Sequence, residues 1–214
     1  MTMNSPATIE ALVADLQPVR PVQSRNGIGL LLLAATLVSV AAAWRYGLRP
    51  DIIAGAPHPM VVLRLGTLLL LGLATGPAAI ATVRPAVGKS QTGWQWALAS
   101  ALLFPMAALI AVAWNGSVAP GEIAADYGEA CLRISLASAL FVGGALTIWL
   151  RQGASVRPAL TGWLTGLAAG SFGTFAYALH CPMTNIVYIG LWYTAAIGIA
   201  ALVGRLIVPP LLRW

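Results

Sequence analysis

The side chains best suited to chemistry in this chain are its two thiols, Cys131 and Cys181. Cys181 follows His180 directly and precedes Pro182 in the stretch LHCPMTN, residues 179–185, which interrupts a long apolar region. Two thiols can form a disulfide where the chain brings their Cα atoms within about 7 Å. Thiolates also favour soft or borderline metals, for which His180 is a candidate further ligand. Two thiols and one imidazole nevertheless leave a tetrahedral metal site incomplete.

Three interpretations of the two cysteines therefore stay open. They form a structural disulfide, they respond to stress by oxidation or metal binding, or they are buried, unpaired and inert. The chain has no CxxC motif, which argues against a thiol–disulfide oxidoreductase. We expect no catalytic residue and no resident cofactor, and we expect any heavy-metal binding at the thiols to be transient.

The composition indicates that the lipid bilayer is the solvent for most of the chain. Of the 214 residues, 59% are hydrophobic and only 8% are charged, whereas soluble domains carry about 25% charged residues. The length favours one compact domain. The formal net charge is +6, but the basic residues stand singly at the ends of apolar runs. That arrangement is typical of membrane topology and not of a nucleic-acid interface.

Six apolar runs are long enough to cross about 30 Å of hydrocarbon, which takes roughly 20 helical residues. They predict an all-α, polytopic bundle of six transmembrane helices that forms one domain at residues 28–214. The runs cover residues 28–44, 61–83, 94–114, 132–150, 159–179 and 187–208.

The distribution of Lys and Arg predicts that both termini lie in the cytoplasm. Eight basic residues fall on the side of the termini: Arg20, Arg25, Arg84, Lys89, Arg151, Arg157, Arg205 and Arg213. The opposite side holds four basic and four acidic residues: Arg45, Arg49, Arg64, Arg133, Asp51, Glu122, Asp126 and Glu129. On this topology both cysteines face the same external compartment, which permits disulfides.

The interiors of the runs hold almost no ionisable residue. Arg64 and Arg133 lie near the ends of runs, where we expect their side chains to extend to the membrane interface. Ion and proton pathways normally use buried charged groups, so the pattern argues against a coupled transporter. A small six-helix transporter or channel is the alternative function. Gly162, Gly166 and Gly170 predict a face for close helix packing, within the bundle or between copies.

The leader at residues 1–27 predicts a short amphipathic helix. Its apolar positions follow the helical spacing i, i+3, i+4 and i+7: Ile9, Leu12, Val13 and Leu16. The opposite face carries Glu10 and Asp15, whereas helices that lie on anionic lipid are rich in Lys and Arg. A groove on a partner protein is therefore the better target. The alternative is a loosely ordered leader, because a helix of about twelve residues is marginal alone.

Both ends of the sequence resemble one protein family. The leader reads IEALVADLQPVRPV, and the chain ends CPMTNIVYIGLWYTAAIGIAALVGRLIVPPLLRW. The most specific marks are ADLQPVR at residues 14–20, the Cys181-Pro182 step, the Trp192-Tyr193-Thr194 triplet and the closing Leu211-Leu212-Arg213-Trp214. With six spans between these ends, the chain resembles the NrsF family of integral-membrane anti-sigma factors.

The resemblance implies a regulator in the bacterial inner membrane. Members of the family are understood to hold an extracytoplasmic-function sigma factor inactive and to release it under stress, with heavy metals or oxidants among the triggers. The family's paired external cysteines correspond here to Cys131 and Cys181, whereas no family motif reaches His180. We therefore expect the apolar stripe of the leader to pack against the sigma factor, with Asp15 and Arg20 at the rim, and we expect no direct contact with nucleic acid.

Overall fold

The computed structural model describes residues 10, 13–14, 23–83, 93–115 and 125–212. Throughout these residues the regular structure is helical and no strand is found, which confirms the all-α prediction. The elements are α2 (Ser24–Tyr46), α3 (Pro50–Ile53), α4 (Pro59–Ala81), α5 (Gly93–Asn115), α7 (Ala125–Leu150), α8 (Pro158–Ala178), α9 (Ile186–Tyr188), the π-helical turn η1 (Ile189–Tyr193) and α10 (Thr194–Leu211).

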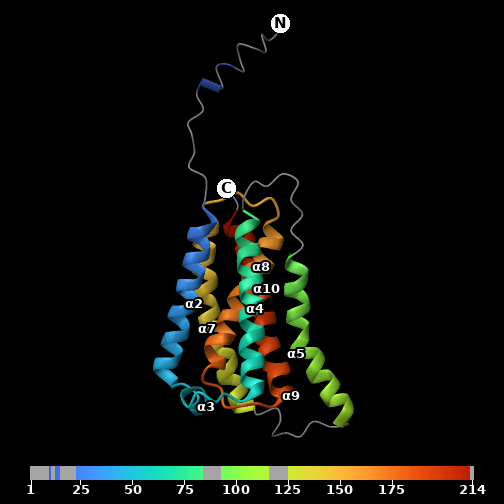
Figure 1. Ribbon diagram of the computed structural model, residues 1–214. Coiled ribbons are helices and arrows are strands. Elements are labelled where there is room, and N and C mark those ends of the chain that lie inside the picture. The colour runs from blue at the N-terminus through green and yellow to red at the C-terminus, as the bar shows by residue number, and fades with distance from the viewer. Residues whose placement is uncertain (1–9, 11–12, 15–22, 84–92, 116–124, 213–214) are drawn as a thin grey trace.

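The long helices run up and down one bundle. The start of α2 and the end of α10 lie at the same end, which we call the terminal end (Figure 1). The short helix α3 and the segment between α8 and α9 lie at the opposite end, which we call the α3 end. Prolines limit several helices: Pro50, Pro59 and Pro158 stand in the first turns of α3, α4 and α8, where a missing N–H costs nothing.

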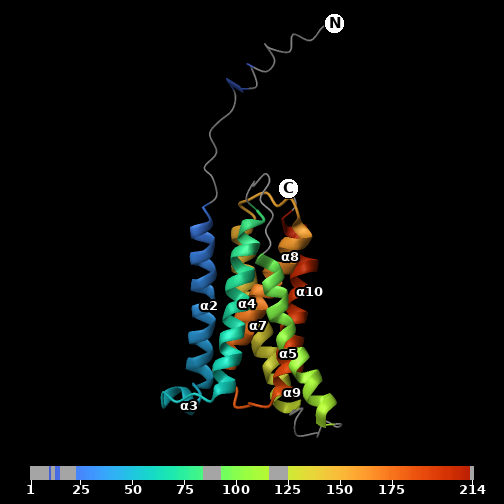
Figure 2. The same cartoon turned by 45° about the vertical axis from the view of Figure 1, so that its right-hand side comes forward.

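The helix α8 forms the centre of the bundle, in contact with α10, α7 and α4. It packs against α10 through small residues: a Cβ at Gly166 would lie 2.4 Å from the carbonyl oxygen of Ala200. This contact confirms the predicted packing face and places it within the bundle. The helix α2 lies at the periphery (Figure 2) and contacts α7, α8 and α4.

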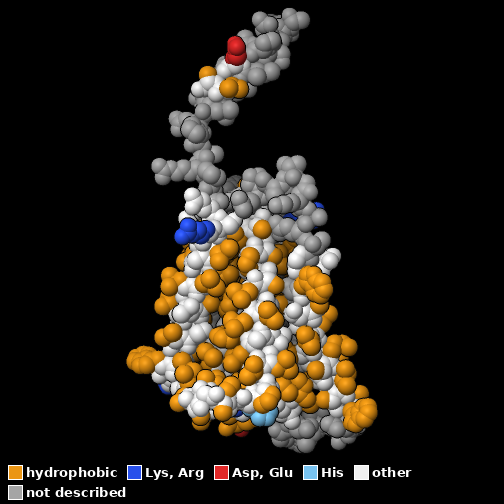
Figure 3. Space-filling model, in the orientation of Figure 1, with side chains coloured by type: hydrophobic (Ala, Val, Ile, Leu, Met, Phe, Trp, Pro, Cys, Tyr) orange, Lys and Arg blue, Asp and Glu red, His pale blue; other side chains and the backbone are white. Residues whose placement is uncertain are grey.

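Four helical segments are long and apolar enough to cross a membrane: Ser24–Tyr46, Pro59–Ala81, Asp126–Leu150 and Ile186–Leu211. Hydrophobic side chains cover most of the face seen in Figure 3. Two of the six predicted spans are not among these segments. In α5, the shorter segment Leu102–Trp114 is apolar, and α8 is rich in Gly, Thr and Ser, most of which are buried. The number of spans therefore stays a prediction.

Within the predicted leader helix, only three residues belong to the described part of the chain. Glu10, Val13 and Ala14 are helical and exposed to solvent. The predicted contact residues Ile9, Leu12, Asp15, Leu16 and Arg20 lie outside the described residues. The amphipathic leader helix therefore stays a prediction, with Val13 as its one described apolar position.

Candidate functional site

The two cysteines lie in one buried cluster at the α3 end of the bundle. Cys131 belongs to the second turn of α7, and Cys181 follows α8 by three residues. Both thiols are free, and each residue is 0% exposed. They pack in a common cluster with the rings of Tyr177, Tyr188 and Tyr193. The fold thus brings together two residues that are fifty positions apart in the sequence.

The tyrosines of this cluster tie the start of α7 to the segment around Cys181. The hydroxyls of Tyr177 and Tyr188 both donate to the carbonyl oxygen of Tyr127, over 3.1 and 2.9 Å. The ring of Tyr193 packs edge-on against the other two rings, at centroid distances of 6.5 and 6.4 Å. Because these rings are buried around the thiols, a reagent in solution reaches either sulfur only after the cluster moves.

The position of the Arg64 side chain differs from the one predicted from the sequence. Its side chain is not exposed at the end of the bundle but is 0% exposed and points into the segment after α8. Its guanidinium donates to the carbonyl oxygens of Ala178, Cys181 and Met183, over 3.0, 2.7 and 2.5 Å. The last carbonyls of a helix lack donors within the helix, and Pro182 has no N–H to offer the carbonyl of Ala178. The physical reason for the burial is therefore that Arg64 finds three acceptors there.

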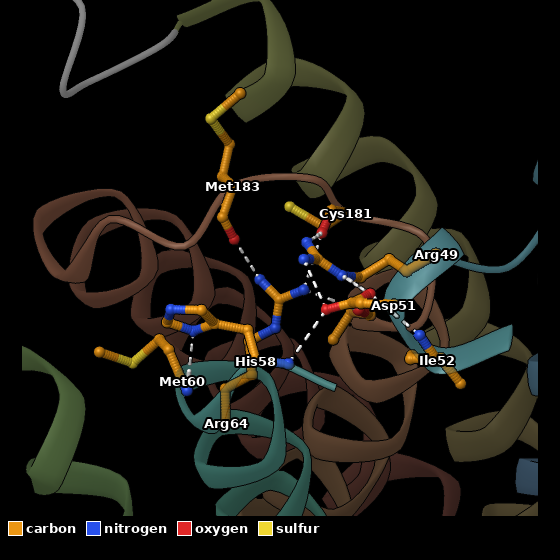
Figure 4. A network of polar contacts seen from close by, with 9 residues as sticks. Arg49, Asp51, Ile52, His58, Met60, Arg64, Cys181 and Met183 are labelled. Carbon is orange, nitrogen blue, oxygen red and sulfur yellow. Dashed lines mark hydrogen bonds and ion pairs between the residues drawn. The ribbon is translucent and has the colours of Figure 1, made fainter. Parts of the chain in front are cut away.

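A second arginine holds the same segment from the loop after α2. Arg49 donates to the carbonyl oxygen of Cys181 over 2.6 Å, and its backbone N–H donates to that of Leu179 over 3.2 Å. Its remaining guanidinium N–H groups form a two-point pair with Asp51, over 2.9 and 3.0 Å. The carbonyl of Cys181 thus accepts from two guanidinium groups, as Figure 4 shows. We call Arg49, Asp51 and Arg64 the arginine clamp.

Asp51 orients the guanidinium of Arg49. Its carboxylate accepts from Arg49 and from the backbone N–H groups of His58 and Ile52, over 3.2 and 3.1 Å. The hydrogen bonds from Arg49, helped by those from His58 and Ile52, hold the pKa of the Asp51 carboxyl well below its usual range. His58 also accepts from the N–H of Met60 through Nδ1 over 3.2 Å, which begins α4.

The charges of the clamp are not balanced. Asp51 pairs with Arg49, and among the described residues no carboxylate lies within ion-pair distance of Arg64. The Nε atom of Arg64 is buried without a hydrogen-bond partner, and its guanidinium carbon lies 5.9 Å from the centroid of the Tyr193 ring. The cysteine cluster therefore contains one buried, uncompensated positive charge.

The comparisons with known proteins identify the family. A family model described as negative regulator of sigma F, NrsF, matches residues 12–214. This chain belongs to the NrsF family. The anti-sigma-F factor NrsF of Caulobacter vibrioides is 29% identical over 228 aligned residues, which cover 99% of this chain and 100% of that protein. A probable anti-sigma-F factor NrsF of Azospira oryzae is 43% identical over 61 residues, or 28% of this chain and 29% of that protein. No solved structure matches the chain significantly.

In this member of the NrsF family, His180 stands apart from the thiols' own cluster. Its half-buried ring lies 5.6 Å from the ring of Tyr46, and it lines a pocket of about 270 Å³ with Asp126. Nowhere in the described ranges do three or more His, Cys, Asp or Glu side chains come together in a way that would hold a metal ion.

The sequence reasoning missed the clamp of this NrsF-family chain. The sequence predicts that Arg64 extends to the membrane interface, and it indicates no role for Arg49 and Asp51 beyond their charge in a loop. An arginine six residues into an apolar helix was the available signal, since ionisable residues at membrane depth are usually functional or paired. Its acceptors are backbone carbonyls more than 110 positions away, and no side-chain pattern marks them.

Proposed function

We propose that this chain is an inner-membrane anti-sigma factor that sequesters an extracytoplasmic-function sigma factor and releases it under heavy-metal or oxidative stress. The observation that carries the proposal is the family match over residues 12–214, together with a full-length relative named as an anti-sigma-F factor. Regulation by sequestration needs a surface that binds the sigma factor on one side of the membrane. It also needs a group that responds to the stress and changes the affinity of that surface.

The proposed topology has six spans with both termini in the cytoplasm. It is supported by the up-and-down order of the helices and by the common end at which α2 begins and α10 ends. It is also supported by the Lys and Arg count of the sequence, in which eight basic residues fall on the predicted side of the termini and four on the opposite side. In this orientation the leader faces the sigma factor, and the two cysteines lie on the periplasmic side.

The proposed partner surface is the apolar stripe of the leader, of which Val13 is exposed in the structure. Deleting residues 1–24 is expected to abolish co-purification with the sigma factor while the helices still insert in the membrane. Replacing Val13 by Asp in the full chain provides the finer test, because it places a charge in the apolar stripe. Replacing the exposed Glu10 by Gln is the matched control. Undiminished binding by the deletion variant would move the partner surface elsewhere.

The proposed sensor is the cysteine pair, because a covalent bond or a metal ion at the thiols supplies a larger interaction energy than a change in exposed charge does. Moving a switch from 1:99 to 99:1 takes about 5.5 kcal/mol of differential interaction. A disulfide typically contributes about 2–4 kcal/mol, which supplies part of this difference. A structural zinc site contributes on the order of 10 kcal/mol, which exceeds it. A bond at either sulfur also requires the buried cluster to open, which would move the segment that the arginine clamp holds.

The cysteine variants test this sensor directly. Cys131→Ser and Cys181→Ser are each expected to bind the sigma factor as the wild type does but to retain it after cells are exposed to cadmium or peroxide. The readout is the amount of sigma factor that co-purifies with the membrane protein before and after exposure. Normal release from both variants would remove the sensing role and leave the anti-sigma function intact.

A further inference from the structure

An apolar groove on the outside of the bundle is lined by α2 and α7. It has a volume of about 950 Å³, and its walls include Val38 and Ala41 on α2 and Ile134 and Ala137 on α7. The groove is open to the surroundings of the bundle, because lining residues at its inner end such as Leu37 and Phe141 are exposed. In a membrane this opening faces hydrocarbon.

The length of the groove matches one leaflet of a bilayer. On α2 the lining runs from Leu37 to Tyr46, and on α7 from Ala130 to Phe141. At 1.5 Å per helical residue these walls are about 14 and 17 Å long. Half of a 30 Å hydrocarbon core is about 15 Å. The groove therefore has the depth of a single acyl chain that extends from the interface to the midplane.

The mouth of the groove carries charge. Arg45 and Arg133 both line it and both are exposed. Arg133 lies 3.5 Å from Glu129, but both side chains are at least 70% exposed, and such pairs contribute little. Arg133 is thus available to a phosphate, and Arg45, whose guanidinium carbon stands 5.3 Å from the centroid of the Tyr46 ring, faces the same mouth.

A second, smaller pocket adjoins the groove. It has a volume of about 270 Å³ and shares Tyr46, Ala130 and Ile134 with the groove. Its own lining adds Tyr127, Tyr177, His180 and the carboxylate of Asp126. A carboxylate beside tyrosine rings attracts an ammonium group, through an ion pair and through cation–π contact.

We propose that the groove and the pocket together hold one phosphatidylethanolamine molecule from the leaflet at the α3 end. One acyl chain lies between α2 and α7, the phosphate lies between Arg45 and Arg133, and the ammonium group lies beside Asp126. Two cations line the groove and the carboxylate of Asp126 lines the adjoining pocket, so a headgroup with both a phosphate and an ammonium group matches this site better than an anionic headgroup does. The proposal is independent of sigma-factor binding and of the cysteines.

The test is lipid retention by the full-length protein. Purified protein is incubated with equimolar phosphatidylethanolamine and phosphatidylglycerol, and the bound lipids are counted by native mass spectrometry. We expect one phosphatidylethanolamine per chain, retained roughly tenfold over phosphatidylglycerol, which corresponds to about 1.4 kcal/mol. Asp126→Asn is expected to remove the preference, and the double variant Arg45→Gln, Arg133→Gln to lower retention of both lipids. Arg25→Gln, exposed at the terminal end, is the matched control.

The groove itself is tested by filling it. Ala137 lines the groove and is exposed, so Ala137→Phe occupies the acyl-chain position without disturbing the core, and we expect it to abolish retention. Ala113→Phe, at an exposed position of α5 outside the groove, is the control. Equal retention of the two lipids by the wild type, or equal retention by the two Phe variants, would mean that only annular lipids are bound and would overturn the proposal.

Discussion

Replacing Arg64 by methionine tests whether the arginine clamp keeps the thiol of Cys181 buried. Methionine preserves much of the apolar stem and removes every donor. The carbonyl oxygens of Ala178, Cys181 and Met183 then lose the guanidinium that holds them at 2.5–3.0 Å. The carbonyl of Cys181 keeps its second donor, Arg49, at 2.6 Å. The other two lose the only side-chain donor that the structure gives them.

The expected magnitude follows from these two carbonyls. A hydrogen bond to a charged group contributes about 1.5–3 kcal/mol net of desolvation. The lower figure for two bonds gives roughly 3 kcal/mol, and 1.4 kcal/mol is a factor of ten. The population in which the segment around Cys181 is open therefore rises about 100-fold.

The assay is the rate of thiol labelling by a maleimide in the folded protein in nanodiscs. Cys131→Ser serves as the background, so that only Cys181 reacts. In the background protein we expect slow labelling, because Cys181 is 0% exposed, and we expect Arg64→Met to raise the rate at least tenfold. Arg133→Met is the matched control, since it removes an arginine whose side chain is 73% exposed. A rate for Arg64→Met within a factor of about two of the background would refute the clamp.

Two further predictions concern the bundle and the clamp. Gly166→Ala places a Cβ 2.4 Å from the carbonyl oxygen of Ala200. We therefore expect a loss of about 1–3 kcal/mol in stability, measured as a lower Tm in detergent. The control is Gly144→Ala, whose added Cβ meets open space and is expected to leave Tm unchanged or raise it. The hydrogen bonds from Arg49 lower the pKa of Asp51 in the folded protein. The ionised carboxylate therefore contributes its full stabilisation above the unfolded-state pKa of about 4. This stabilisation decreases as the pH falls from about 4 toward the lower folded-state pKa. The Tm difference between wild type and Asp51→Asn is therefore expected to shrink between pH 7 and pH 3, and a constant difference would contradict this role.

The helical structure and the close packing of α8 through its small residues could be predicted from the sequence, because both depend on the local spacing of residues. Gly166 and its neighbours four residues away necessarily share one face of a helix, so the prediction of close packing needed no partner to be named. The partner, α10, came only from the fold. The leader is the opposite case. Its apolar stripe can be predicted from the sequence, but the spacing does not identify the surface that binds it.

The central position of α8 also required the tertiary structure. Its Gly, Thr and Ser content makes it less apolar than α2 or α10, and hydropathy alone does not distinguish a buried helix from one that faces lipid. In the fold these small residues are buried because they allow α10, α7 and α4 to approach the same axis. Small residues serve this purpose in membrane bundles, where close packing replaces the hydrophobic effect between helices.

By itself, the sequence determined that the chain is helical and apolar and that its ends resemble one family. The physical reason is that apolar runs of this length must satisfy their backbone groups internally in lipid, which selects helices. Only the tertiary structure decided that Arg64 turns inward, that Arg49 meets it at one carbonyl, and that Cys131 and Cys181 share a buried cluster. Those outcomes depend on how the helices are rotated and on backbone acceptors far along the chain. The types and spacing of the side chains do not predict either.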